Sequence, residues 1–405
     1  MANYLDNIFQ NLYTYVKKNN YEGIDLFDGL NSRLFKNTPF YKSKYFRLAL
    51  IQFCKLSPIN LRKILLVPKG FNPKAGALFL LGHLNMFKAT NENLHKEEAQ
   101  ELFTRLKDLL IKREKGIGWG YNFDWQARAF YVPIGTPNVV TSVYVGKALL
   151  EYYEVFEDSE ALELAKEIAE FITNEMIIFE NEKDLCFRYI PSETTEVHNA
   201  NLLAASFLSS IDKHTGSNIF REKIIKSVNF SISYINEDGS WPYGTQPFHK
   251  WVDNFHTAFN IESLIDIRDN SDLANLNPTI GKVTKYYLDN LFTDKGLAKY
   301  YNDKLYPIDI HVIAESLIAL NKIKVSKITC DEIKLAYIEQ QILNQAKSFQ
   351  DKKGYFYFQK HKHFWNKTPY IRWGQAWMFF AISNLVERHT KSCGEGILGP
   401  IVTIC

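Results

Sequence analysis

The chain has 405 residues, of which 46% are hydrophobic, and 48 Lys and Arg against 45 Asp and Glu leave a formal net charge of +3. This composition supplies enough apolar surface for a large core. Lys and Arg occur throughout the chain, and we expect no basic stripe of the kind that nucleic-acid binding requires. No run of 18 apolar residues occurs, so we expect no membrane span.

The first segment, Met1 to Lys18, is amphipathic and carries Asp6, Lys17 and Lys18 instead of the apolar centre of a signal peptide. The five cysteines have spacings that fit neither a zinc site nor a disulfide framework. We therefore predict a cytoplasmic protein with reduced thiols. Because no HExxH or paired CxxC motif is present, we also predict no metal and no other cofactor.

A short pattern recurs along the chain: a glycine or small turn, alternating aromatic residues, a polar loop and then an amphipathic helix. Its clearest copies are Gly118–Tyr121 and Gly239–Tyr243, with variants at 186–189, 296–301 and 354–358. Such alternation is typical of a short strand or an extended loop.

Each copy precedes a helix of mostly small and apolar residues. These helices are expected to begin near Val139, His198, Asn254, Asp309 and Ile371, at intervals of 59, 56, 55 and 62 residues, and an earlier one covers Gly76–Lys88. Between them lie more polar helices, over 159–177, 219–235, 279–291 and 331–349, with apolar residues at i, i+3, i+4 and i+7. Each repeat of about 60 residues therefore predicts an inner and an outer helix.

Six such hairpins can close into a ring, which predicts an all-α (α/α)6 toroid with its aromatic loops on one face. We expect one domain over residues 1–390, because no Gly/Ser- or Pro-rich linker divides it. Helices within residues 1–60, at Asn3–Lys18 and Ser43–Cys54, would pair with Ile371–Arg388 to close the ring. The tail from 391 to 405 differs in composition and receives no role.

Every aromatic loop enters the N-terminus of an inner helix, so residues of the loops and first turns should converge on one face. Helix N-termini favour anionic groups there. Asp253–His256 and Asp309–His311 place an acid beside an imidazole in two separate repeats. The catalytic candidates are Asp253, Asp309, Asp124, His256, His198 and His311. The substrate-binding candidates are Trp119, Tyr121, Trp125, Arg128, Glu196, Asn199, Asn201, Trp241, Tyr243, Asn254, Tyr301, Arg372, Trp373 and Gln375.

Structural roles are the alternatives for these residues. Asp253 and Asp309 precede or open helices and could act as N-caps. The Trp and Tyr side chains of the repeated motif could pack the loops onto the rim of the ring instead of stacking on sugars.

The stretches GWGYNFDWQ (118–126), HNANLLAA (198–205), DGSWPYG (238–244), WVDNFHTAF (251–259) and YPIDIH (306–311) resemble a poorly characterised family of bacterial and archaeal proteins associated with surface-polysaccharide biosynthesis. The fold of that family is similar to the six-hairpin toroid of several glycoside hydrolases, polysaccharide lyases, sugar epimerases and terpenoid cyclases. The resemblance implies this fold and a carbohydrate setting, with an oligosaccharide or polysaccharide as substrate; it fixes no reaction. The helix N-termini would suit an acidic substrate.

Three functions remain open. Glycoside hydrolysis requires two carboxylates beside the scissile bond, for which Asp253 and Asp309 are the first choice and Asp124 the third. Proton abstraction beside a uronate carboxylate, by a lyase or a C5-epimerase, would use Asn199, His198, His256, Arg372 and Tyr243 or Tyr301. The third is glycan binding without turnover. Terpenoid cyclisation is disfavoured because no DxDD or DDxxD motif is present.

Overall fold

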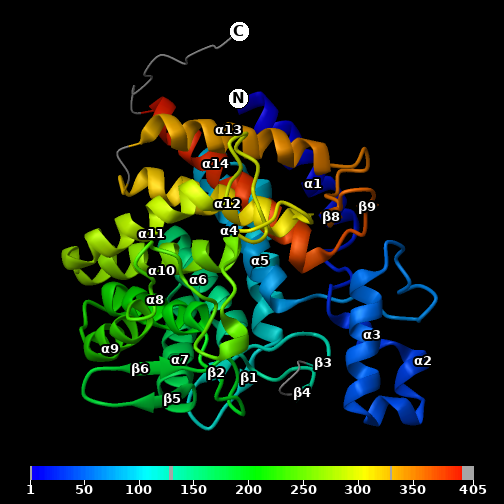
Figure 1. Ribbon diagram of the computed structural model, residues 1–405, viewed down its shortest axis with the longest axis horizontal. Helices are drawn as coiled ribbons and strands as arrows, with labels where there is room; N and C mark the ends of the chain where they lie inside the picture. Colours follow the sequence, from blue (N-terminus) through cyan, green and yellow to red (C-terminus); the bar gives the residue numbers. More distant parts are fainter. Residues whose placement is uncertain (1, 127–130, 329–330, 395–405) are drawn as a thin grey trace.

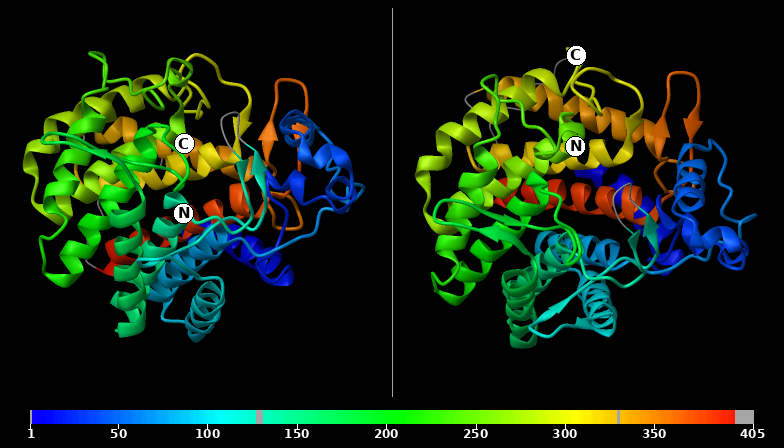
Figure 2. Two further views of the ribbon diagram at one scale, coloured as in Figure 1. Left: turned by 90° about the horizontal axis from the view of Figure 1, so that it is seen from below. Right: turned by 60° about the horizontal axis from the view of Figure 1, so that its bottom comes forward.

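Six helices form the inner ring of the structure, a computed structural model that describes residues 2–126, 131–328 and 331–394. They are α4 (Pro73–Thr90), α6 (Val139–Phe156), α8 (His198–Thr215), α10 (Asn254–Ser271), α12 (Ile310–Val325) and α14 (Trp377–Gly394), the last preceded by the π-helical turn η5 (Ile371–Ala376). Each helix packs against the next, and α14 (red in Figure 2) packs against α4, so the ring is closed. The all-α toroid expected from the sequence is confirmed.

Six outer helices cover the ring. They are α5 (Asn93–Asp108), α7 (Ser159–Glu175), α9 (Arg221–Ile232), α11 (Asn277–Asn290), α13 (Glu332–Phe349) and α1 (Ala2–Lys18). The first five each pack against the inner helix that precedes them in sequence, whereas α1 packs against α14 and completes the sixth hairpin. The N-terminal segment therefore supplies the last outer helix, as the sequence predicts.

Most residues of the inner helices are buried, because neighbouring helices cover them on both sides. In α4, every residue from Pro73 to Met86 is buried. The helices also approach each other closely: an added Cβ at Gly82 of α4 would lie 2.4 Å from the Phe379 ring of α14, and one at Gly146 of α6 would lie 2.4 Å from Phe207 of α8. Glycine thus permits two of the contacts that close the ring.

Short antiparallel hairpins form much of the connecting loops. They pair β1 (Ile111–Lys112) with β2 (Ile117–Gly118), β3 (Trp125–Gln126) with β4 (Tyr131–Val132), and β5 (Ile177–Glu180) with β6 (Leu185–Phe187). A three-stranded sheet has the order β7 (Ile308–Asp309), β8 (Gln359–Lys360) and β9 (Trp365–Asn366). Two short 3-10 turns, η3 (Pro247–His249) and η4 (Ala274–Leu276), complete the connections.

One segment lies beside the ring instead of within it. It contains η1 (Asp28–Asn31), α2 (Arg33–Lys36), η2 (Pro39–Lys42) and α3 (Lys44–Leu56), which pack on one another, while α3 also contacts β3 (Figure 1). The buried guanidinium of Arg62 anchors the segment through Asp28 and the backbone carbonyls of Asp25 and Leu26. The helix expected at Ser43–Cys54 therefore forms, but α1 alone takes the ring-closing place.

The structure leaves two expectations about chain organisation untested, namely the domain boundaries and the tail. The boundaries of the single domain predicted over residues 1–390 stay a prediction, and residues 395–405 of the tail lie outside the described part. Among the described residues, none of the helices has the length and apolarity needed to cross a membrane.

Gly82 gives a test of ring closure. A Gly82→Ala variant should lower the free energy of unfolding by about 1–3 kcal/mol, because the new methyl group overpacks against the buried Phe379 ring. Gly281 of α11 is the matched control, since no atom lies within 4 Å of an added Cβ there. Gly281→Ala should raise the free energy by about 0.5–1 kcal/mol through helix propensity. Urea denaturation measures both, and equal effects of the same sign would contradict the packing argument.

Candidate active site

A cavity of about 690 Å³ opens where the inner helices begin. All six inner elements contribute a residue from their first two turns, because the chain enters every inner helix from this face. The residues that they contribute are Lys74 (α4), Val140 (α6), Asn199 (α8), Phe255, His256 and Phe259 (α10), His311 (α12), and Arg372 and Trp373 (η5). The remaining walls are Phe27, Tyr121, Phe123, Trp125, Tyr189, Glu193, Thr195, Val197, Tyr243, Phe248, His249, Trp251 and Tyr301. The volume is typical of a site for a small ligand.

Asp253 holds His256 in a defined orientation. One carboxylate oxygen of Asp253 caps α10 by accepting the His256 backbone N–H at 2.9 Å, and the other accepts the His256 Nδ1–H at 2.6 Å. Trp251 Nε1 also donates to this second oxygen at 3.1 Å. Because Nδ1 carries the proton toward Asp253, Nε2 is the nitrogen of His256 left for a ligand.

Asp309 orients His311 in a related way, through the backbone. Its carboxylate caps α12 by accepting the His311 N–H at 2.8 Å, and it also accepts from Trp373 Nε1 and Gln359 Nε2. The His311 ring lies against Trp373, with 4.5 Å between ring centroids. Burial is the main cause that raises the pKa of Asp309 to about 6. Burial, with Lys74 and Arg372 nearby, holds the pKa of His311 well below its usual value, so this imidazole is neutral.

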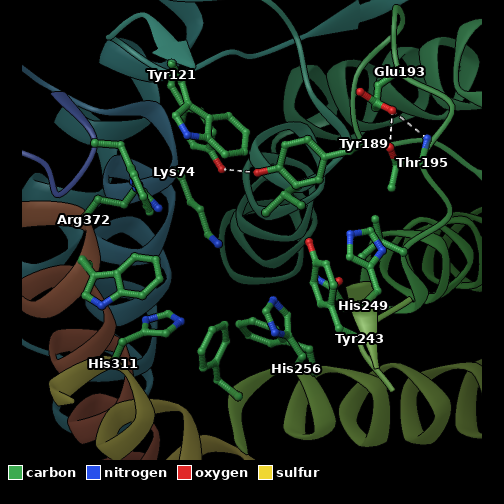
Figure 3. A pocket seen from close by; sticks show the side chains of 18 of the residues that line it. Lys74, Tyr121, Tyr189, Glu193, Thr195, Tyr243, His249, His256, His311 and Arg372 are labelled. Atoms are coloured by element: carbon green, nitrogen blue, oxygen red, sulfur yellow. Dashed lines mark hydrogen bonds between the residues drawn. The ribbon is translucent and has the colours of Figure 1, made fainter. Parts of the chain in front are cut away.

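Lys74 lies at the base of the cavity and was not among the residues predicted from the sequence. Its Nζ lies 4.4 Å from the Tyr144 ring and 4.9 Å from the Trp377 ring, and no carboxylate among the described residues forms an ion pair with it. Burial and the Arg372 cation lower the pKa of Lys74 strongly. Figure 3 shows its side chain pointing into the cavity, between the tyrosines on one side and His311 on the other.

Around Lys74 and one helical turn beyond the lining residues, side chains fill the space between the inner helices. Tyr144 is 6% exposed, Trp377 1% and Glu315 0%. Glu315 follows His311 by four residues on α12, so both lie on the same face of that helix. Burial, together with the nearby Glu262 carboxylate, raises the pKa of Glu315 well above its usual value.

Arg372 binds an acid from a distant part of the chain. Its Nε and Nη2 donate to the two carboxylate oxygens of Asp25 at 2.7 and 2.8 Å, and both side chains are buried. The guanidinium also lies 4.9 Å from the Tyr121 ring. Asp25 neutralises the charge of Arg372. Of these two basic residues of the lining, Lys74 is therefore the one without a carboxylate partner in the described part of the chain.

Aromatic rings and one carboxylate complete the lining. Tyr243 stacks on Trp251 with 4.8 Å between centroids, and the hydroxyls of Tyr121 and Tyr189 are 2.7 Å apart. Glu193 is the single carboxylate among the described lining residues. Its oxygen accepts the backbone N–H and the hydroxyl of Thr195 (Figure 3).

The structure brings nine of the predicted site residues to this cavity. They are Tyr121, Trp125, Asn199, Tyr243, His256, Tyr301, His311, Arg372 and Trp373. The lining residues that sequence reasoning did not select include Lys74, Tyr189 and His249. The Asn72-Pro73 pair could have revealed Lys74, because Asn at an N-cap followed by Pro marks a helix start, and α4 begins three residues before the expected Gly76.

The three carboxylates predicted to be catalytic lie outside the lining. Asp253 and Asp309 act as N-caps directly behind His256 and His311. Asp124 lies toward the lateral segment, where it accepts from the Tyr41 hydroxyl at 2.6 Å and from the Ile134 N–H at 2.8 Å.

The other predicted residues hold the scaffold. Trp119 and Trp241 are buried in the core, and Trp119 Nε1 donates to the Leu106 carbonyl. His198 packs near Tyr234 and Trp241, and burial lowers its pKa to about 3. The Glu196 carboxylate accepts from the Thr245 hydroxyl.

Three of these residues are amides on inner elements that bind backbone groups. Asn201 accepts from the Phe187 N–H, Asn254 donates to the Leu291 carbonyl, and Gln375 bonds both backbone groups of Phe356. They fasten aromatic loops to the ring. Arg128 lies outside the described residues.

No model of a known protein family matches the sequence, and no curated protein is detectably similar to it. Solved structures are similar in fold. A sugar epimerase from a ruminal bacterium aligns over 78% of this chain and 88% of its own, with a TM-score of 0.62 and 15% identity. A polysaccharide lyase aligns over 80% of this chain and 92% of its own, with a TM-score of 0.59 and 9% identity. The family 76 glycoside hydrolase (mannosidase) Bt3792 from Bacteroides thetaiotaomicron aligns over 81% of this chain and 89% of its own, with a TM-score of 0.59 and 11% identity. The (α/α)6 toroid is thus shared with enzymes of three reaction classes.

Asp309→Asn tests the buried acid at the site. The raised pKa of Asp309, from 3.8 to about 6, means that the folded state favours the protonated form. The resulting stability is present below pH 4 and is lost as pH rises through about 6. Asn does not titrate, so the variant keeps its stability as pH rises. The difference in free energy of unfolding, variant minus wild type, should therefore increase by about 2–3 kcal/mol between pH 4 and pH 7.

Urea denaturation at pH values between 4 and 7 measures the difference. Asp28, also buried with a pKa of about 6, is unchanged in both proteins and cancels from it. Asn138→Ser at the N-cap of α6 is the matched control, because neither side chain titrates, and it should give a difference constant with pH. A constant difference for Asp309→Asn would contradict the assignment.

Proposed function

We propose that the protein is a carbohydrate-processing enzyme in which His256 and His311 act on a carbon next to a carbonyl or carboxylate group. The observation that carries the proposal is that His256 and His311 line one aromatic cavity, while the carboxylates predicted to be catalytic do not line it. The buried Asp253 carboxylate bonds the His256 imidazole, and the His311 imidazole stacks on Trp373. Proton transfer is the chemistry that such a pair of imidazoles performs. The toroid fold, shared with an epimerase and a lyase, is compatible with it.

His256 is the proposed general base. Its Nε2 is free to accept a proton, and the Asp253 carboxylate, 2.6 Å from Nδ1, stabilises the imidazolium that results. Removal of this carboxylate charge should therefore weaken the base without removing it.

His311 has a different proposed role. Because its imidazole is neutral and the residue lines the cavity, its ring N–H is the proposed donor to the oxygen beside the reacting carbon. A neutral donor placed at a developing negative charge stabilises the enolate-like intermediate. In an epimerase the intermediate then turns in the cavity, so that the protonated His256 returns the proton to the opposite face of the carbon. In a lyase the bond from the β-carbon to its oxygen breaks, and the leaving oxygen takes up the proton.

The cavity favours a saccharide that bears a negative charge. Lys74 has no carboxylate partner among the described residues, all six inner helices begin at this cavity with the positive ends of their dipoles, and Glu193 is the single described carboxylate in the lining. A uronate carboxylate beside Lys74 would raise the pKa of the lysine by pairing with it. The proposal includes the polysaccharide-biosynthesis setting and the cytoplasmic location that the sequence predicts.

Hydrolysis by paired carboxylates receives less support from the geometry. That mechanism needs two carboxyl groups on either side of the scissile bond. The oxygens of Asp253 and Asp309 are engaged by helix N–H groups and indole N–H groups behind the lining.

The reaction class can be tested by incubating the protein with neutral and uronate-containing oligosaccharides in D2O. Deuterium uptake at a carbon next to a carbonyl or carboxylate, without cleavage, would identify an epimerase. New ultraviolet absorbance from an unsaturated uronate would identify a lyase. New reducing ends with neither signal would overturn the proton-transfer proposal in favour of hydrolysis.

His256→Gln tests the proposed base. It should reduce kcat by about 10²-fold or more, the usual contribution of a general base. Asp253→Asn should reduce kcat less and leave KM nearly unchanged, because the carboxylate acts through the imidazole. His361→Gln, on the hairpin of β8 and β9 and outside the lining, is the matched control and should keep wild-type activity. A His256→Gln variant with wild-type kcat would contradict the assignment.

A further inference from the structure

The lateral segment has a charge balance unlike that of the whole chain. We call residues 29–70 the lateral unit, which includes α2 and α3. It contains nine basic residues, namely Arg33, Lys36, Lys42, Lys44, Arg47, Lys55, Arg62, Lys63 and Lys69, and no Asp or Glu. The acids that flank it are Asp28 and Glu92. The even charge balance of the chain therefore conceals one purely basic region.

The same unit carries many of the most exposed large apolar side chains of the described protein. They are Leu34 (52%), Phe40 (50%), Tyr45 (82%), Phe46 (50%), Phe53 (58%), Leu56 (68%), Ile59 (68%), Ile64 (69%) and Leu66 (51%). Single exposed apolar residues are common on protein surfaces, whereas a concentration of this kind marks a binding surface.

Helix α3 explains how these side chains come to be exposed. Ile51 and Cys54 are buried and hold the helix against the rest of the unit. Tyr45, Phe53 and Leu56 follow one another at spacings of eight and three residues on the exposed face. Phe46 adds to this surface with its ring 4.7 Å from that of Phe40. The helix thus has a second apolar face that the described chain does not cover.

Exposed lysines accompany this apolar face. Lys42, Lys44 and Lys63 are exposed and form no ion pair with any described residue, whereas Lys36 and Arg62 are paired with Asp124 and Asp28. Aromatic and aliphatic side chains together with unpaired lysines are the composition of helices that lie in the interfacial plane of a membrane.

We propose that the lateral unit docks on the surface of an anionic lipid bilayer. Its exposed aromatic and aliphatic side chains enter the boundary between headgroups and acyl chains, and its unpaired lysines bind the phosphate-bearing headgroups. A second copy of the chain is a poorer occupant, because two lateral units would bring like charges together without any acid to pair them.

Docking would place the cavity close to the headgroups. Helix α3 packs on β3, whose Trp125 lines the cavity, and the Lys55 Nζ lies 5.6 Å from the ring of Phe27, another lining residue. The proposal does not depend on the chemistry in the cavity, since it rests on the composition and exposure of the lateral unit alone.

Vesicle sedimentation with the full chain tests the proposal. The protein should sediment with vesicles of equal parts phosphatidylcholine and phosphatidylglycerol, and much less with phosphatidylcholine alone, and added salt should weaken the binding. Replacing Lys42 and Lys44 by Gln should weaken binding about fivefold for each lysine removed. Tyr45→Ser with Phe53→Ser should weaken it about tenfold or more by removing two inserting rings.

Ile219→Ser and Ile333→Ser are matched controls, because both side chains are exposed (73% and 87%) but lie outside the lateral unit. They should bind vesicles like the wild type, and thermal unfolding should show that all variants are folded. Failure of the wild type to bind anionic vesicles would overturn the proposal, as would equal binding by the Tyr45 and Phe53 variant. Self-association that this variant abolishes, without vesicle binding, would assign the surface to a second copy instead.

Discussion

The contact between α4 and α14 is the constraint on which the molecule depends. It joins segments about 300 residues apart, through the close approach of Gly82 to Phe379 and a hydrogen bond from Asn85 to Ser383. Each inner helix has a neighbour on both sides only because this contact closes the ring. Closure also fixes the direction of the six helices, so their first turns meet at one face and can share a cavity.

Repeated apolar patterns predicted most of this fold. The helices that begin at Val139, His198 and Asn254 start at the expected residues, because an aromatic loop motif precedes each of them. Asn138 and Asp253 also cap the first and the third. The pattern could not assign the segment at Ser43–Cys54 correctly. An amphipathic pattern predicts that a helix has an apolar face, but the rest of the structure determines which element packs against that face. For α3, part of the surface has no partner within the described chain.

The site divides in the same way. The pairing of acid and imidazole at Asp253–His256 and Asp309–His311 could be predicted, because the residues of each pair are close in sequence. The sequence could not predict which member of each pair would line the cavity. The acid acts as an N-cap and faces the backbone N–H groups, which leaves the imidazole at the surface of the cavity. The Asp25 partner of Arg372 was beyond sequence reasoning, because the two residues are 347 positions apart. Burial, which no local pattern measures, governs the pKa directions of Lys74 and His311.

The buried side chains beyond the cavity have a consequence for how the proposed enzyme would handle a polymer. Tyr144 and Glu315 lie one helical turn after the lining residues Val140 and His311, and both are buried, so side chains fill the ring at this depth. Under the proposed function, a long glycan would therefore not slide through the centre of the ring. It would approach His256 and His311 from the face at which the inner helices begin, and the product would leave by the same face.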